Sequence, residues 1–191
     1  MGKIRAFIAI ELDEAMRRHM AEAQERLRRA GRLPVRWARP DSAHVTLKFL
    51  GEVEPEAVSR IAGAVAQAAG AAKPFHVGFG AIGAFPSPRS ARIMWLGLTG
   101  ETAALSDLRD AVESFVTPLG FPAEARPFTP HVTLARLQDG ARPVDLEAIR
   151  AGAEIPRESV SQKITDVVLF RSDLSRGGPV YTPLCRFPLT G

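Results

Sequence analysis

The chain has 191 residues, of which 46% are hydrophobic and 24% charged, and 25 Lys and Arg against 21 Asp and Glu give a formal net charge of +4. These values are typical of a globular protein and exclude disordered, collagen-like and coiled-coil chains. No window approaches the roughly 20 apolar residues that a membrane span requires, and the single cysteine, Cys185, excludes an internal disulfide. We therefore expect one domain over residues 1–191, located in the cytoplasm, with no membrane association and no obligate protein partner.

Predicted strands and helices alternate along the chain. Apolar residues three and four apart indicate helices, and β-branched or aromatic runs indicate strands. In chain order these are a strand at 4–10, a helix at 12–30, a strand at 44–50, a helix at 58–69, strands at 75–80 and 92–98, a helix at 105–119, a strand at 131–137, a short helix at 145–151, and strands at 164–170 and 180–187. Glycine and proline punctuate the junctions without a low-complexity linker. This order predicts a compact α+β fold.

An internal repeat is the most informative feature of the sequence. Residues 38–50 align without gaps on residues 125–137, and eight of the thirteen positions are identical. Unrelated segments of ordinary composition share about one position in such a comparison. The repeat therefore predicts a duplicated, bilobal fold in which each lobe contributes one copy of the motif.

Each copy of the repeat contains the tetrapeptide His-Val-Thr-Leu, at residues 44–47 and 131–134. In a strand, residues two apart point to the same face, so the histidine and threonine of each copy share a face while valine and leucine face the core. Two pseudo-equivalent strands that meet between the lobes bring His44 with Thr46, and His131 with Thr133, to one cleft.

Two facing histidines suit proton transfer at a phosphodiester. An ordinary histidine pKa near 6.5 leaves both protonation states available close to neutrality, so one ring can act as general base and the other as general acid. Threonine hydroxyls donate hydrogen bonds to phosphate oxygens as charge builds there. This chemistry requires no metal and no cofactor, and neither motif contains the additional Cys, Asp or Glu ligands of the alternative, a zinc site. The other histidines, His19 and His76, receive no role.

The motifs resemble those of the two-histidine (2H) phosphoesterase superfamily, and within it the RNA 2′,3′-cyclic phosphodiesterases, formerly described as 2′-5′ RNA ligases. The resemblance covers most of the chain. It comprises residues 5–10, 44–51, 85–86, 95–97, 126–136 and 169–172, together with Leu174, Gly178 and Tyr181. It implies a fold with two antiparallel sheets that form a central cleft, helices on their outer faces, and one catalytic histidine from each lobe.

The resemblance also implies roles in the hydrolysis of an RNA terminal 2′,3′-cyclic phosphate to a 2′-phosphate. His44 is then the proton donor to the departing O3′, and His131 is the proton acceptor that activates water. Thr46 and Thr133 match the threonines that bind the phosphate. Weak 2′-5′ ligation, the reverse of ring opening with a 5′-hydroxyl in place of water, is expected at most.

Two further residues match substrate-binding positions of the family: Arg136, near the phosphate, and Phe49, which stacks on a base. Strict alternation along their strands puts both side chains on the face opposite to the histidines, so each is expected to act from a strand end or around a bend. Two other functions stay open. One is hydrolysis of a different cyclic or linear nucleotide phosphodiester, and the other is an RNA-end binding module that uses Arg136, Lys48 and aromatic stacking without turnover.

Overall fold

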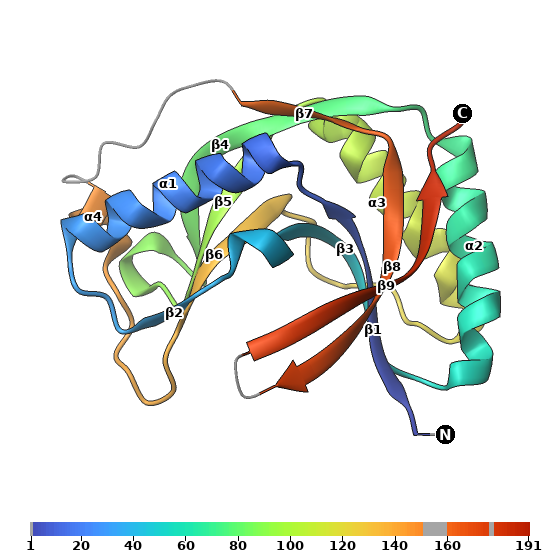
Figure 1. The fold of residues 1–191 in the computed structure, drawn as a ribbon, viewed down its shortest axis with the longest axis horizontal. Helices are drawn as coiled ribbons and strands as arrows, with labels where there is room; N and C mark the ends of the chain where they lie inside the picture. Colours follow the sequence, from blue (N-terminus) through green and yellow to red (C-terminus); the bar gives the residue numbers. More distant parts are fainter. Residues whose placement is uncertain (1, 151–159, 176–177) are drawn as a thin grey trace.

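The computed structural model describes residues 2–150, 160–175 and 178–191. Within these residues nine strands form two antiparallel sheets, which lie side by side in Figure 1. Sheet A has the order β3-β1-β8-β9 and sheet B the order β2-β6-β5-β4-β7. The strands of sheet A are β1 (Ile4–Glu11), β3 (His44–Val53), β8 (Asp166–Ser175) and β9 (Gly178–Pro188); those of sheet B are β2 (Val35–Trp37), β4 (Phe75–Phe85), β5 (Ile93–Gly100), β6 (His131–Leu137) and β7 (Ser161–Ile164).

The helices cover the outer faces of the sheets, and two of them, α1 (Glu14–Ala30) and α3 (Thr102–Val116), each cover the sheet other than the one that contains the strand before them. Helices α2 (Val58–Ala71) and α3 pack together against sheet A, whereas α1 and the short α4 (Leu146–Arg150) lie on sheet B (Figure 1). Helix α1 follows a strand of sheet A yet covers sheet B, and α3 follows a strand of sheet B yet covers sheet A. As a result, one continuous cluster of buried side chains runs behind both sheets.

Local sequence explains where helix α1 begins and which side it buries. The Asp13 carboxylate accepts a hydrogen bond from the Met16 backbone N–H at 2.8 Å, which caps the first turn. Met16, Met20 and Leu27 then recur at helical spacing and are all fully buried. Burial of such side chains contributes roughly 1.5–3 kcal/mol each, so this face fixes how α1 lies on sheet B.

The two sheets repeat the same strand pairing around the two histidines. In sheet A the antiparallel register pairs β1 with β3 so that Glu11 lies opposite His44, and in sheet B it pairs β5 with β6 so that Gly97 lies opposite His131. Each repeated motif therefore begins a strand, β3 or β6. The partner of β3 is β1, which precedes α1, and the partner of β6 is β5, which precedes α3. The predicted fold class, a duplicated α+β fold with two antiparallel sheets and outer helices, is confirmed.

Most predicted elements are present, although several of their bounds differ. The run 164–170 divides into β7 and β8, because the chain passes at Thr165 from sheet B to sheet A. The three-residue strand β2 was not predicted; it is too short to show a periodic pattern. The strand predicted at 75–80 continues to Phe85, and residue 151 of the last predicted helix lies outside the described residues.

Candidate active site

The two histidines occupy equivalent places at the first residues of β3 and β6. Val45 and Leu47, like Val132 and Leu134, are buried in the core as predicted, whereas His44, Thr46, His131 and Thr133 are on the opposite side of their strands. We call this side, which faces away from the helices, the histidine face of each sheet. Strands β3 and β6 approach each other directly, so the two histidine faces adjoin.

Each imidazole ring is oriented by the backbone two residues before it. His44 Nδ1 lies 2.9 Å from the Ser42 carbonyl oxygen, and His131 Nδ1 lies 2.6 Å from the Thr129 carbonyl oxygen. Because a carbonyl can only accept, Nδ1 is the donor in both rings. The Nε2 atom of each ring is therefore left to exchange protons with a ligand.

Burial lowers the pKa of both histidines below the ordinary value. Desolvation is the largest cause that lowers the pKa of His44 below its usual value, opposed by the hydrogen bond to Ser42, and the positive charge of Arg136 and the nearby His131 lower it further. Desolvation also lowers the pKa of His131, and Arg136 again adds to the shift. Arg136 thus lies within electrostatic reach of both rings.

Strict alternation does not hold at Phe49 and Arg136, because each residue follows an irregularity in its strand. In the register of sheet A, Ile8 pairs with Lys48 and Ala9 with Thr46, so Leu47 is an extra residue that forms a β-bulge. Leu47 and Lys48 are consecutive and both buried, so the alternation between the two faces of the strand shifts by one residue. The next side chain, Phe49, therefore lies on the histidine face, with 63% of its surface exposed.

Strand β6 contains the same irregularity. Met94 pairs with Ala135 and Trp95 with Thr133, so Leu134 is the extra residue. Arg136 is consequently exposed on the histidine face. A bulge cannot be read from hydrophobic alternation, because it changes the period by a single residue; here it repeats at the same position in both copies of the motif.

Buried polar side chains from α1 and α3 secure both bulges from behind. Gln24 of α1 donates hydrogen bonds to the carbonyl oxygens of Ala38, at 2.7 Å, and of the bulged Leu134, at 2.9 Å. Next to the other bulge, the Lys48 ammonium group binds the Glu113 carboxylate of α3 and the Pro122 carbonyl oxygen. Lys48 is a predicted RNA contact of the binding-module alternative, but its side chain is buried in this ion pair, with 8% of its surface exposed.

Aromatic rings surround each histidine, and sequence analysis gave these rings no role. The ring of His44 lies 4.8 Å from that of Phe7 and 5.0 Å from that of Tyr181, measured between centroids. The ring of His131 lies 5.2 Å from that of Phe85 and 5.8 Å from that of Trp95. All of these positions fall in segments of the family resemblance, which was the available signal.

Trp95 presents an unsatisfied donor on the histidine face of sheet B. It lies directly opposite Thr133 in the register, and its indole N–H is buried without a hydrogen-bond partner among the described residues. The Trp95 ring contacts Gly83, where an added Cβ atom would come within 2.1 Å of it. The missing side chain at Gly83 is therefore what makes room for Trp95.

Glu11 distinguishes the surroundings of the two histidines. Its negative charge opposes the lowering of the His44 pKa, while no carboxylate acts in this way on His131 within the described structure.

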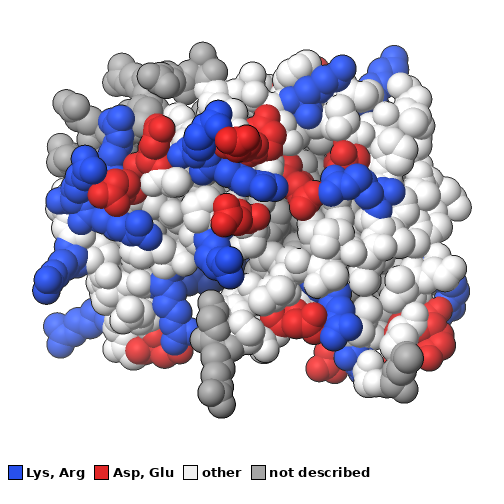
Figure 2. Space-filling view, viewed as in Figure 1, with Lys and Arg blue, Asp and Glu red and all other residues white. Residues whose placement is uncertain are grey.

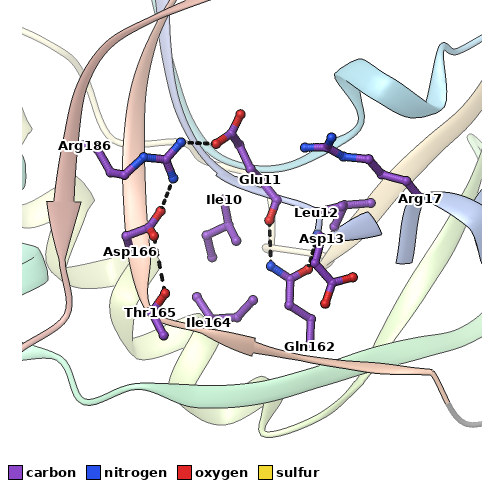
Figure 3. Close-up of a pocket in the computed structure, with 10 residues that line it drawn as sticks. All are labelled: Ile10, Glu11, Leu12, Asp13, Arg17, Gln162, Ile164, Thr165, Asp166 and Arg186. Carbon is purple, nitrogen blue, oxygen red and sulfur yellow. Dashed lines mark hydrogen bonds and ion pairs between the residues drawn. The ribbon is translucent and has the colours of Figure 1, made fainter. Parts of the chain in front are cut away.

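Glu11 also lines a cavity of about 200 Å³ at the end of β1 (Figure 3). There Arg186 bridges the carboxylates of Glu11 and Asp166, and Gln162 of β7 hydrogen-bonds the backbone of Glu11 and Asp13. Neither histidine lines this cavity.

The remaining histidines and the cysteine lie away from this arrangement. His19 is buried on α1 against the ring of Phe79, and His76 is exposed beside Glu101. Cys185 is a half-buried free thiol. The described part of the chain contains no group of three or more His, Cys, Asp or Glu side chains arranged to hold a metal ion.

The charged surface is mixed in sign. Figure 2 shows basic and acidic side chains interspersed over much of one face, with basic ones gathering where α1 ends. Among its described residues this face lacks the continuous basic stripe of proteins that bind duplex nucleic acid. Within the described structure, no helix is long and apolar enough to cross a membrane.

Comparison with known proteins gives the same duplicated arrangement. A family model described as LigT-like phosphoesterase matches residues 10–95 and again residues 96–181. The chain is 35% identical over 187 residues to an RNA 2′,3′-cyclic phosphodiesterase of Methanothermobacter thermautotrophicus, covering 98% of this chain and 100% of that protein. It superposes on TT0787 of Thermus thermophilus with a TM-score of 0.81 at 28% identity, covering 98% and 99% of the two chains.

E. coli LigT in complex with 3′-AMP also superposes on this structure, with a TM-score of 0.73 at 28% identity and 99% of both chains covered. The two matches to one family model fall on the two halves that the internal repeat defines, and each contains one His-Val-Thr-Leu motif. Together with the identity over nearly the whole length, they show that the chain belongs to the LigT-like phosphoesterase family, part of the 2H superfamily.

Proposed function

We propose that this protein hydrolyses the terminal 2′,3′-cyclic phosphate of RNA to a 2′-phosphate. The observation that carries this proposal is the pair of equivalent histidines on adjoining faces. Each ring has Nδ1 bound to a backbone carbonyl, which leaves Nε2 for the substrate, and the charge of Arg136 acts on both rings. The name of the relative from Methanothermobacter supports the substrate, and the 3′-AMP in the E. coli LigT structure supports recognition of a nucleotide.

His131 is the general base and His44 the general acid of this reaction. His131 Nε2 takes a proton from water as the water oxygen bonds to phosphorus, the bond from phosphorus to O3′ breaks, and protonated His44 delivers the proton on Nε2 to O3′. The asymmetry of the two sites supports this assignment, because Glu11 favours the protonated form of His44 and has no counterpart at Gly97, opposite His131.

Four side chains hold the phosphate and the base in this proposal. Thr46 and Thr133 donate hydrogen bonds to the non-bridging oxygens, and Arg136 balances the charge that develops on them. The exposed ring of Phe49, on the same face as His44, offers a stacking surface for the terminal base.

No metal or cofactor takes part in the proposed reaction. The proposed RNA substrate and the free thiol favour a cytoplasmic location.

The proposal is tested with a short RNA that ends in a 2′,3′-cyclic phosphate, incubated in excess EDTA. The product is identified by chromatography against 2′- and 3′-phosphate standards. We expect the 2′-phosphate from the wild type and at least a hundredfold lower rate from each of His44→Ala and His131→Ala, as removal of a general acid or base produces. His76→Ala, an exposed histidine of sheet B, is the matched control and should retain the wild-type rate.

A second substrate separates the acid from the base. A phosphodiester with a p-nitrophenolate leaving group needs no proton donor, so His44→Ala should hydrolyse it close to the wild-type rate while His131→Ala should not. The opposite pattern would exchange the two roles. Wild-type binding of the RNA end without any product would instead make the protein an RNA-end binding module, and turnover of other nucleotide phosphodiesters alone would reassign the substrate.

A further inference from the structure

The histidine face of sheet A continues well beyond the histidine. Along β1 the even-numbered residues enter the core, whereas Phe7 and Ala9 belong to a separate aromatic cluster on the histidine face. Alternation therefore places Arg5 on this same face, at the opposite end of β1 from Glu11. Ala9 lies opposite Thr46, so Arg5 stands about 13 Å further along the sheet, four residues at ~3.3 Å each.

The interval between Thr46 and Arg5 contains an aromatic cluster, in which Phe49 is 63% exposed while Phe7 and Phe170 are buried. Phe7 lies opposite Phe49 on one neighbouring strand and opposite Phe170 on the other, with ring centroids 6.1 Å and 5.2 Å away. The ring of Tyr181 stands edge-on against Phe7 at 5.0 Å. Phe49 therefore offers the exposed stacking surface between Thr46 and Arg5, and a nucleoside bound there with its 3′ end toward His44 would have its 5′ end toward Arg5.

Arg5 is an exposed guanidinium group with no ion pair in the described part of the chain. The nearest acid in the register is Glu52, directly opposite on β3, and the two side chains form no salt bridge. The positive charges of Arg5 and Arg136 both oppose the rise in the pKa of the Tyr181 hydroxyl that burial causes. Arg136 and Arg5, neither of which has an ion pair among the described residues, therefore both lie within electrostatic reach of the Tyr181 hydroxyl.

We propose that Arg5, with the Tyr181 hydroxyl, binds the phosphodiester on the 5′ side of the terminal nucleotide. This inference rests on the proposed function and specifies its substrate class: the site recognises the end of a polynucleotide chain in preference to a cyclic mononucleotide. Arg136 and the threonines hold the cyclic phosphate, the exposed Phe49 ring carries the terminal nucleoside, and Arg5 holds the next phosphate. A guanidinium group suits this position because it donates two parallel hydrogen bonds to phosphate oxygens.

The test compares two substrates that differ by one nucleotide, that is, by the 5′ phosphodiester and the nucleoside attached to it. One is a nucleoside 2′,3′-cyclic phosphate with a free 5′-hydroxyl, and the other is a dinucleotide that ends in the same cyclic nucleotide. Arg5→Gln should raise KM for the dinucleotide about tenfold, the effect of one lost hydrogen bond to a charged group, with kcat within twofold. The cyclic mononucleotide should be hydrolysed by Arg5→Gln as by the wild type.

Arg171→Gln is the matched control. Arg171 lies opposite Ala6, a core-facing residue, and its guanidinium group pairs with Asp173. The variant therefore loses the same charge from the same end of sheet A, but on the other face, and should leave both substrates unaffected. In addition, the affinity of a dinucleotide ending in a 2′-phosphate should depend less steeply on salt in Arg5→Gln, by about 0.7 in the logarithmic slope for one lost contact to a single strand.

Each other result overturns the inference. Equal losses on both substrates would mean that Arg5 serves the cyclic phosphate or the fold, and no loss on either would mean that it contacts no phosphate. An effect of Arg171→Gln equal to that of Arg5→Gln would reduce the role of Arg5 to long-range charge. Failure of the proposed function is distinct, because the wild type would then hydrolyse neither cyclic substrate.

Discussion

Replacement of Lys48 by methionine should destabilise the protein and weaken substrate binding together. Lys48 follows the bulge in β3 and precedes Phe49, and its ammonium group is buried against Glu113 and the Pro122 carbonyl oxygen. Methionine keeps the length and apolar character of the side chain but removes the charge. Glu113 then remains buried at 10% exposure without one of its cations.

The expected loss of stability follows from what Glu113 retains. Removal of one partner from a buried ion pair costs about 3–5 kcal/mol. Glu113 keeps a hydrogen bond from Arg109 at 2.6 Å and one from the Glu124 backbone N–H at 2.7 Å, so we expect the lower end, about 3 kcal/mol. In a protein of this size, each kcal/mol changes Tm by roughly 2–4 °C, which gives a decrease of about 6–12 °C.

The dependence on pH provides a second check. Burial raises the pKa of Glu113. The hydrogen bonds from Lys48 and the Glu124 N–H, together with the charges of Lys48 and Arg109, lower this pKa by more than burial raises it, so that it lies below its ordinary value of 4.5. A depressed pKa in the folded state contributes stability that is complete above the ordinary pKa and is lost as pH falls through the folded one. The difference between wild type and Lys48→Met should therefore shrink below pH 4.5.

Chemical denaturation at pH 7 and at pH 3.5 measures this difference, and steady-state kinetics supplies the functional readout. Because Phe49 is adjacent, KM for cyclic-ended RNA should rise more than kcat falls. Lys3→Met removes the same charge from an exposed pair with Glu54 and should cost less than about 1 kcal/mol. A loss below 1 kcal/mol in Lys48→Met, or a difference that is as large at pH 3.5 as at pH 7, would refute the reasoning.

Three further predictions concern the site and the fold. Because burial lowers both histidine pKa values, kcat/KM should pass through a maximum below pH 6.5, and NMR titration with inorganic phosphate should raise both pKa values; a flat profile from pH 5 to 9 would count against the coupled pair. Gly83→Ala should displace the Trp95 ring, lowering kcat/KM at least tenfold with altered tryptophan fluorescence, whereas Gly63→Ala, in open space on α2, should leave both unchanged. Since one core joins the two sheets, calorimetry should record a single unfolding transition over the whole chain, and two separable transitions would contradict the single domain.

The duplicated architecture and the histidine pair could be predicted from the amino-acid sequence alone. The repeat is visible because eight identical positions at a constant offset exceed chance, and His-x-Thr spacing places both side chains on one face of any strand. The same local reasoning identified helix α1, whose cap at Asp13 and buried stripe are encoded within a few turns. Such features depend on residues close in sequence, so a pattern can predict them.

Which other side chains lie beside the histidines depends on how the strands pair and the helices pack. The bulges at Leu47 and Leu134 arise from the register with β1 and β5, and they turn Phe49 and Arg136 toward the histidine face against the simple alternation. The exchange of α1 and α3 between the sheets, which places Gln24 and Glu113 behind those bulges, likewise depends on long-range packing. Partners separated by as many as 110 residues leave no local pattern, because their contact exists only once both sheets have formed.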